Sequence, residues 1–451
     1  MPCFASTAIG AENRLYSPDL PALKAVGAAA APADTNSARA ILSRAGQPLS
    51  YGDLASLLKA VLLPSGAGVA SIVCECSARL RRKLFGIAVI TMAPVEIANT
   101  CLSDCLFCGW RRSNQIMKRL AIPDDLAMLQ VEYLVGLGIH HIEFVSGDDI
   151  KAVRESLPRL IAQTRELFRR RGIDGIISFC TLALTERQYR DLKSAGADAM
   201  ILWQETYDRR VFKQHIKGGP KASGIDDDWK QVRGGDGCRF RIESQERALR
   251  AGLDVALGSM LGLNPDICAD FLAAVDHARY LAAHYDITPE HPMIIGMPIW
   301  NPITTHATDL RPARAPGMET IFPAIAGLYM LALPRRSVWI FPNCRVSMDQ
   351  QIEAARVAGV FTSTEVKLGP GGYLPSILKN IRHGNSGTEA LWRRAADLVK
   401  QAVESEEELA RVLDEHEQFV HHYHTHEAYL RAMERAGLRL AARASLPATD
   451  D

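Results

Sequence analysis

Apolar and amphipathic stretches alternate along most of the chain, beginning near residue 84. Stretches with the three-to-four-residue spacing of helices separate short apolar runs, and several of them end at glycine, as helices often do. Eight apolar runs are typical of buried strands: 85–97, 141–147, 175–183, 198–206, 254–262, 293–300, 337–343 and 360–368. Eight strands alternating with helices predict an α/β protein, a parallel (β/α)8 TIM-type barrel. An open doubly wound sheet has the same alternation and remains an alternative.

The chain on either side of this alternation has a different pattern. Two short helical patterns predict an N-terminal helical extension over residues 1–80, before a barrel over 81–376. Charged helical patterns then predict a C-terminal helical tail over 377–451. A polar, glycine-rich insertion at 208–240 follows the fourth strand, and we expect it to form a loop over the rim. In such a barrel, functional residues follow the strands on that same rim.

Composition narrows the class of protein. Of the 451 residues, 47% are hydrophobic and 23% are charged, as in ordinary globular domains. A net charge of +1 gives no general attraction to nucleic acid or to a membrane, and no apolar run is long enough to span a bilayer. The N-terminus lacks the charged start and apolar core of a secretory signal. We therefore expect a cytoplasmic protein, with some of its ten cysteines kept reduced for metal binding.

Three cysteines stand close together in the stretch CLSDCLFCGWRRSN. Cys101, Cys105 and Cys108 follow the first predicted strand among loop-forming residues, although on a helix the same spacing would form a buried stripe. A structural zinc site needs a fourth ligand. The nearest histidines, His140 and His141, open the second strand and would lie at the opposite rim. Three thiolates on a cluster of four irons would leave one iron open for another ligand.

This loop resembles the cluster-binding loop of the radical S-adenosylmethionine superfamily. The likeness lies in the C-x3-C-x2-C spacing, in Phe107 before the last cysteine, and in the position after the first strand. It implies that the three cysteines bind one 4Fe-4S cluster, which with S-adenosylmethionine generates a 5′-deoxyadenosyl radical. The stretch WQETYDRRVFKQHIKGGPK is similar to the biotin synthase and thiamin tyrosine lyase group, above all to its lyases of aromatic amino acids. An electron donor such as flavodoxin or ferredoxin is implied as partner.

The same resemblance assigns roles to residues at the other strand ends. Gly147 and Asp148 would receive the methionine amino group of the cofactor, although a simple turn also explains this pair. Glu205 and Arg241 would bind S-adenosylmethionine. An unpaired buried carboxylate is costly, so Glu205 is not explained by packing alone. Ser259, in GSMLGL, would let the backbone approach the cofactor closely.

The end of the seventh strand is the candidate substrate site. Counting back from the GGY at 371–373 places Arg345 where the lyase subgroup binds the substrate's carboxylate. Cys344 and Val346 stand where that subgroup has threonine and glutamate, so the rest of the pocket differs. A surface arginine at a strand end is the alternative. The resemblance makes Arg345 and Glu205 the expected catalytic residues.

Other cysteines and histidines are expected to be structural. Cys180 stands where biotin synthase has a ligand of a second cluster, but a lone buried cysteine usually packs as a small hydrophobe, so we expect one cluster. Clustered histidines can bind metal, but on a charged helix we expect a solvated face. The tail histidines concerned are His416, His421, His422, His424 and His426.

These expectations define a hypothesis for the function. The protein would be a lyase of cofactor biosynthesis that abstracts hydrogen from a small amino-acid-like substrate and cleaves a carbon–carbon bond. Sulfur insertion or carbon-skeleton rearrangement on the same scaffold is the alternative among enzymes. A non-catalytic iron–sulfur or zinc-binding scaffold protein is the alternative outside enzymes.

Overall fold

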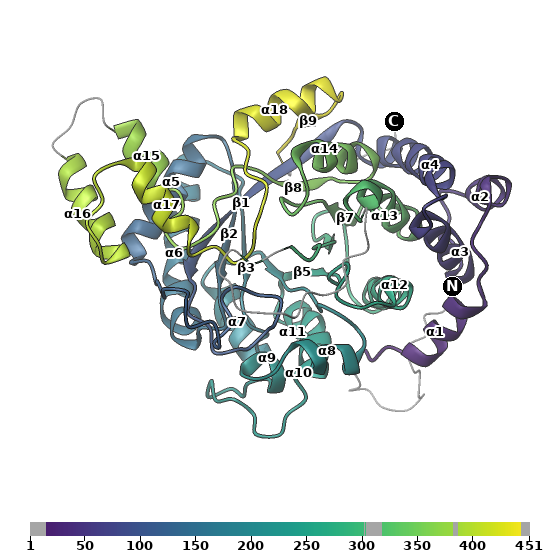
Figure 1. Ribbon diagram of the computed structural model, residues 1–451, viewed down its shortest axis with the longest axis horizontal. Coiled ribbons are helices and arrows are strands. Elements are labelled where there is room, and N and C mark those ends of the chain that lie inside the picture. The colour runs from purple at the N-terminus through teal and green to yellow at the C-terminus, as the bar shows by residue number, and fades with distance from the viewer. Residues whose placement is uncertain (1–14, 302, 304–317, 382–386, 443–451) are drawn as a thin grey trace.

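Eight parallel strands form the centre of the molecule (Figure 1). The computed structural model describes residues 15–301, 303, 318–381 and 387–442. The strands are β1 (Ala88–Ala98), β2 (His141–Ser146), β3 (Ile176–Cys180), β4 (Ala199–Ile201), β5 (Asp254–Leu257), β6 (Met293–Gly296), β7 (Val338–Phe341) and β8 (Phe361–Ser363). They pair in the order β7-β6-β5-β4-β3-β2-β1-β8, and one parallel bridge, Ile340 with Gly359, joins β7 to the segment before β8. The α/β TIM-type barrel predicted from the sequence is confirmed.

The predicted apolar runs are longer than the strands that they contain. Parallel strands are buried on both faces and therefore read as continuous apolar runs, and all of β1 is buried. Beyond the ends of β4 and β5 the chain leaves the ladder, and pairing continues as an isolated bridge between Glu205 and Ser259. These continuations carry side chains into the mouth of the barrel.

Helices cover the outside of the strands (Figure 1). They are α5 (Asp124–Gly136), α6 (Leu157–Arg171) with the π-helical turn η1 (Ala152–Ser156) before it, α7 (Glu186–Ser194), α11 (Ser244–Arg250), α12 (Ile267–His284), α13 (Met318–Ala332) and α14 (Met348–Val357). Local sequence fixes several of their ends. Thr185 and Gln188 form a reciprocal capping box at the start of α7, and Gly172 ends α6 in the left-handed conformation.

The insertion after β4 is partly helical, where a loop was expected. It contains α8 (Arg209–His215), α9 (Pro220–Ser223) and α10 (Gly237–Ile242). Side chains of Asp208 and Asp236 cap α8 and α10 by accepting backbone N–H groups. The insertion packs on the cysteine loop, because Asp104 donates its N–H to the Gly218 carbonyl (3.1 Å) and accepts that of Lys217 (2.8 Å).

Four helices precede the barrel: α1 (Leu20–Ala29), α2 (Thr35–Leu42), α3 (Tyr51–Leu62) and α4 (Ala67–Phe85). Of these, α1, α3 and α4 pack on its outer helices α12 and α13, and α2 packs on α4. The sequence patterns predicted α2 and α3 but not α4. The buried carboxylate of Asp276, on α12, accepts hydrogen bonds from the hydroxyls of Tyr16 (2.9 Å) and Tyr51 (2.7 Å). The extension thus shares one core with the barrel.

The C-terminal part returns to the barrel. It contains α15 (Leu374–Ile381), α16 (Gly387–Val399), α17 (Glu406–Asp414), α18 (His426–Arg435) and the strand β9 (Arg439–Leu440), which pairs in parallel with the start of β1. Between α17 and α18, residues 415–425 cross the end of the barrel without forming a helix (Figure 1). We call this segment the strap.

Candidate functional site

The cysteine loop follows β1 and is closed by side chains within it. Asn99 accepts the N–H of Leu120 (2.7 Å) and donates to the carbonyl of Lys118 (2.9 Å). The Arg119 guanidinium donates to four carbonyls of the loop, among them that of Trp110 (2.7 Å). A polar loop of this kind satisfies its own backbone, and its three cysteines are left to face inward.

Cys101, Cys105 and Cys108 line one pocket at the carboxyl end of the barrel, as the sequence predicted for a barrel rim. The backbone N–H of Asp148 donates to Cys101 Sγ (3.4 Å), and Gln418 Nε2 donates to Cys108 Sγ (3.3 Å). Burial raises the pKa of all three thiols. Binding a metal would therefore have to supply the free energy of their deprotonation. We call this cavity the thiol pocket.

The three thiols are not grouped around the position of a single metal ion. Among the described residues, no three His, Cys, Asp or Glu side chains are grouped so as to hold one metal ion. Zinc binds each thiolate at about 2.3 Å, so its ligands crowd together. In a cubane each thiolate binds a different iron, and the ligands stand further apart. The donor set of the thiol pocket thus fits a 4Fe-4S cluster.

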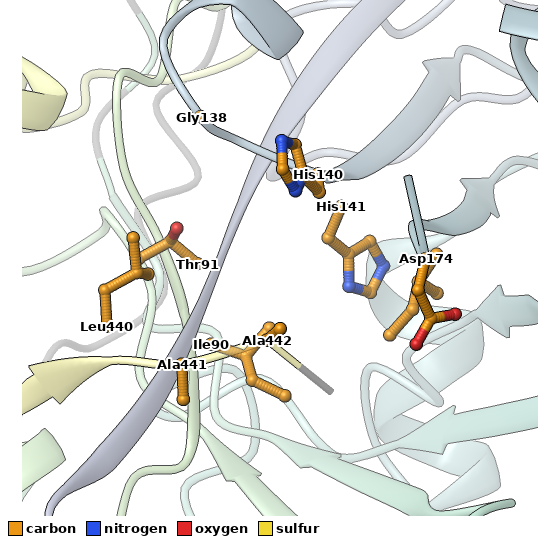
Figure 2. A pocket seen from close by; sticks show the side chains of 10 residues that line it. Ile90, Thr91, Gly138, His140, His141, Asp174, Leu440, Ala441 and Ala442 are labelled. Carbon is orange, nitrogen blue, oxygen red and sulfur yellow. The ribbon is translucent and has the colours of Figure 1, made fainter. Parts of the chain in front are cut away.

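His140 and His141 lie in a different pocket (Figure 2). That pocket is at the amino ends of β2 and β3, and Asp174 and Leu440 also line it. Figure 2 shows both imidazoles beside the β1 ribbon, with the Asp174 carboxylate near His141. Neither histidine lines the thiol pocket, so a zinc site that shares ligands with the cysteine loop is not supported by their positions.

Gly147 and Asp148 brace the cysteine loop. A Cβ at Gly147 would lie 2.3 Å from the Thr100 carbonyl oxygen, so this close approach requires glycine. The Asp148 carboxylate accepts the hydroxyl of Ser103, and its carbonyl accepts the N–H of Leu102 (3.1 Å). Both residues line the thiol pocket, and their contacts are more specific than those of a simple turn.

Glu205 enters the thiol pocket from the continuation of β4. Its φ of 68° is unusual for a residue with a side chain, and such backbone strain gathers at functional sites. Its Oε1 lies 2.5 Å from Lys221 Nζ and 3.4 Å from Arg241 Nη2, while its buried Oε2 has no hydrogen-bond partner in the described structure. Burial alone would raise the pKa of Glu205, but Lys221 and Arg241 outweigh it and lower that pKa. One oxygen of an ionised carboxylate is therefore free to bind a ligand.

Lys221 is a site residue that the sequence analysis did not single out. It follows Gly219, whose backbone lies against the cysteine loop at φ 82°. Its own N–H donates to Ser103 Oγ (2.9 Å), and its ammonium lies 5.4 Å from the centre of the Phe107 ring. The sequence feature that could have identified Lys221 is the GGPK motif of the insertion, of which it is the last residue. Only the fold shows that this segment turns back toward the thiols.

Arg241 and Ser259 differ in how they relate to the pocket. Arg241 is buried, its Nε donates to the Trp203 carbonyl, and it lines the thiol pocket. Ser259 is also buried, but its hydroxyl bonds to Tyr329, and its neighbour Met260 lines the pocket instead. The backbone at Ser259 is thus beside the pocket, whereas its side chain points elsewhere.

Arg345 is half-buried at the end of β7 and lines the thiol pocket. Its Nη1 donates to the Ile299 carbonyl (3.1 Å), and its guanidinium carbon lies 3.5 Å from the centre of the Phe419 ring. Burial lowers the pKa of Arg345, although Cys344 and Glu205 oppose that shift. The side chain is held in place by stacking and by one carbonyl, and it faces the pocket with its remaining donors.

The strap supplies the other residues that sequence reasoning missed. The expectation of a solvated helical face for the tail histidines was wrong: the strap is not helical, its His416 and His424 are buried, and His426 is buried at the start of α18. The Trp110 indole donates to the carbonyl of His416 (2.8 Å), and the Gly109 N–H donates to that of Gln418 (2.9 Å). These bonds tie the strap to the cysteine loop.

A second cavity continues the thiol pocket into the barrel, and we call it the barrel pocket. The two share Val145, Cys180, Trp203, Arg345, Gln418 and Phe419. Cys344 also lines the barrel pocket, and burial raises the pKa of its thiol to about 12. A ligand at the thiols and a second molecule in the barrel would therefore meet beside Arg345.

Three thiols on the loop after β1, at the mouth of a parallel barrel, are the arrangement that the resemblance to radical S-adenosylmethionine enzymes implied. No family model matches the chain. Three curated proteins are similar in sequence, and two of them are from different groups. The 2-iminoacetate synthase of Escherichia coli K12 is 27% identical over 230 residues, 51% of this chain and 55% of its own length. The FeFe hydrogenase maturase subunit HydE of Thermotoga maritima is 26% identical over 53% of this chain and 61% of its own length. The chain thus spans little more than half of these relatives.

Solved structures share the fold over nearly the whole chain. The hydrogenase maturase HydG of Carboxydothermus hydrogenoformans superposes with a TM-score of 0.68, 18% identity, and coverage of 94% of this chain and 84% of that one. Methylornithine synthase superposes with a TM-score of 0.56 and 15% identity, over 84% of this chain and all of that one. The resemblance to the radical S-adenosylmethionine superfamily, within the group of 2-iminoacetate synthase and HydG, is confirmed.

Proposed function

We propose that this protein is a radical S-adenosylmethionine enzyme acting on a small amino-acid-like substrate. The observation that carries the proposal is the convergence on one pocket of three thiols, the Glu205 carboxylate and the Arg345 guanidinium. When bound, a 4Fe-4S cluster and S-adenosylmethionine would supply a 5′-deoxyadenosyl radical that abstracts a hydrogen atom from the substrate. The electron would come from a donor such as flavodoxin or ferredoxin.

The residues around the thiols prepare a place for a charged cofactor. Cys101, Cys105 and Cys108 would hold three irons. Glu205 keeps one free carboxylate oxygen in the pocket, fixed by Lys221 and Arg241, and this oxygen is suited to hydroxyl or ammonium groups of the cofactor. Gly147 and Asp148 add backbone groups at the same wall.

Arg345 is suited to the carboxylate of the substrate. Its guanidinium is half-buried, is oriented by Phe419, and lines both pockets. A planar fork of donors binds a carboxylate in a fixed orientation. Holding the substrate there places its α-carbon at the junction of the pockets, and orientation decides which hydrogen a radical removes.

A lyase reaction is the leading assignment. The name of 2-iminoacetate synthase states its product, the imino acid that remains when an amino acid loses its side chain. We propose carbon–carbon cleavage of this kind for the present chain. The substrate itself is not fixed by this likeness, since Cys344 and Val346 replace the residues expected in the lyase subgroup.

Sulfur insertion is the second candidate, favoured by one observation. Cys180 and Cys344 both line the barrel pocket, and a second cluster would need thiol ligands of this kind. Two thiols are fewer than the three of the cysteine loop, which is why we place this assignment second. Iron content separates the two candidates.

The proposal includes a cytoplasmic location and no membrane partner. Along the described part of the chain, every helix is too short or too polar to cross a bilayer. Oxygen-sensitive cluster chemistry is also easier to maintain in a reducing compartment.

The experiment is anaerobic reconstitution with iron and sulfide, followed by dithionite and S-adenosylmethionine. We expect about four irons per chain and formation of 5′-deoxyadenosine. Cys101→Ala, Cys105→Ala and Cys108→Ala should each abolish both, while Cys74→Ala, on α4 away from the pocket, should retain them. Clearly more iron in the wild type would favour sulfur insertion. Cofactor cleavage that survives loss of a loop cysteine would refute the cluster assignment.

A further inference from the structure

Apolar side chains surround Glu143 in the barrel pocket. Along β2, alternate residues face the same side, and Glu143 and Val145 both line the barrel pocket. Their neighbours across the cavity include Met92, Phe341 and Trp203. Barrel interiors are normally filled by such apolar side chains. Packing of the barrel interior therefore does not explain a carboxyl group at Glu143.

Within the described part of the chain, Glu143 has no partner to compensate its burial. It is 8% exposed, and none of the hydrogen bonds or ion pairs among the described residues involves its carboxylate. Burial raises the pKa of Glu143 to about 8. An unpaired buried carboxyl group costs free energy of folding, and such costs are typical of functional sites. The group points into a cavity and is available to a ligand there.

The carboxyl groups of the cavity can pair with a cation once they ionise. Glu96 also lines the barrel pocket, and its carboxylate accepts the N–H of Gly369. Glu143 raises the pKa of Glu96 further, beyond the effect of burial. Arg345 is the basic residue of the same cavity and lies at its mouth, where it also lines the thiol pocket. Two carboxyl groups thus face one guanidinium.

We propose that the barrel pocket binds an amino acid whose carboxylate meets Arg345 and whose side chain ends in a basic nitrogen that meets Glu143. A basic group would let Glu143 ionise and would supply the partner that the protein lacks. The rings of Trp203, Phe341 and Phe419 line the path between the two ends and suit the stem or the charge of such a side chain. The proposal rests on the proposed function for its choice of an amino acid.

The test is binding, measured by calorimetry under anaerobic conditions on the reconstituted full-length protein. Lysine and norleucine differ mainly in the terminal ammonium and form the central pair of probes, with arginine, histidine, tyrosine and tryptophan beside them. We expect lysine or another basic amino acid to bind at least about tenfold more tightly than norleucine, because norleucine leaves Glu143 unpaired.

Two variants locate the preference. Glu143→Gln should reduce the lysine-to-norleucine ratio severalfold, and Glu143→Leu should reverse it, while Arg345→Ala should weaken both probes alike. Glu132→Gln, which changes an exposed carboxylate on α5, is the matched control and should leave the ratio unchanged. Equal binding of lysine and norleucine, tighter binding of tyrosine or tryptophan, no binding of any probe, or a ratio unaffected at Glu143 would each overturn the proposal.

The test is separable from that of the proposed function. Cleavage of S-adenosylmethionine in the absence of substrate reports on the thiol pocket alone. Normal cleavage with no preference for basic side chains would reject the substrate class and retain the enzyme class. A protein that selects lysine through Glu143 but never cleaves the cofactor would retain the binding site and reject the radical enzyme.

Discussion

The thiol pocket and the barrel pocket share a wall, but in each the pKa of one carboxyl group is shifted, and the two shifts have opposite directions. In the thiol pocket, Glu205 lies between Lys221 and Arg241, and these cations lower its pKa. In the barrel pocket, Glu143 has no partner and its pKa is raised to about 8. The first pocket is organised before any ligand arrives, as suits a cofactor that always binds in one way. Among the described residues, the barrel pocket leaves the Glu143 carboxyl group without a hydrogen-bond partner. This arrangement suits a site in which the bound substrate supplies the missing partner.

Among the substitutions that test this contrast between the two pockets, we expect the largest loss of activity at Lys221. Lys221→Met removes the nearer of the two cations of Glu205 and one contact between the insertion and the cysteine loop. We expect cofactor cleavage to fall by at least about 100-fold, because truncating one partner of a buried ion pair typically costs about 3–5 kcal/mol. The measurement is 5′-deoxyadenosine formation against the concentration of S-adenosylmethionine.

Lys217→Met is the matched control, since Lys217 is exposed on the same segment. It should behave as the wild type does. Iron content should be measured on both variants, because an unfilled cluster would also lower cleavage. Cleavage by Lys221→Met within twofold of the wild type, at equal iron, would show that Glu205 does not depend on this cation.

A smaller effect is expected where the strap meets the shared wall. Phe419→Ala removes the ring that stacks on Arg345. Desolvated cation–π contacts contribute about 1–2 kcal/mol, so we expect the Kd of the substrate to rise roughly 5- to 30-fold. Cleavage of S-adenosylmethionine without substrate should change little. Val420→Ala, at the exposed neighbour, is the control, and equal losses from both variants would mean that the strap acts only through folding.

The strap also donates a hydrogen bond to Cys108, a proposed cluster ligand. Loss of this bond should change the reduction potential of the cluster. Gln418→Leu removes the N–H donor to Cys108 Sγ. Hydrogen bonds to cluster sulfurs stabilise the more negative reduced state. We expect the reduction potential of the reconstituted cluster to fall by roughly 20–60 mV, equivalent to about 0.5–1.5 kcal/mol for one electron. A redox titration followed by electron paramagnetic resonance measures it. Gln115→Leu, exposed in the same loop, should not shift the potential.

The sequence was sufficient for the parts of the molecule that repeat or that lie close together along the chain. The eight strands were predictable because strands buried on both faces are continuous apolar runs. The cysteine loop was predictable because its three thiols lie within eight residues, in a spacing tied to one chemistry. Arg345 was found by counting from a glycine pair, and its contacts with Ile299 and Phe419 place it at the pocket and not on the open surface.

Residues brought to the site by long-range packing could not be predicted in this way. The strap has no helical or strand period, and its place is fixed by bonds to Trp110 and Gly109, which are distant in sequence. Its histidines stand between two charged helices, α17 and α18, and were for that reason assigned to a charged helical face. Lys221 reaches Glu205 because the insertion folds against the cysteine loop, and nothing in a polar, glycine-rich stretch indicates that direction.

The smallest effect tests the barrel pocket without any cofactor. Glu143 has a pKa of about 8 in the folded protein, above its ordinary value of about 4.5. Between these pH values the folded state binds more protons at this residue than the unfolded state does. Its contribution to stability is therefore greatest below pH 4.5 and is lost as the pH rises through 8. Glu143→Gln cannot ionise and should escape that loss.

The Tm of the Glu143→Gln variant should consequently gain on that of the wild type as the pH rises from 5 to 9, by about 2–5 °C. Taking the difference between the two proteins cancels the groups that titrate in both, although Glu96 faces Glu143 and its own pKa should fall in the variant. Glu132→Gln should show no such trend. A flat difference would mean that Glu143 already has a partner in solution, and the contrast between the two pockets would then be lost. A Tm difference that increases with pH would show that the Glu143 carboxyl group lacks a partner in the free protein and is available to a ligand.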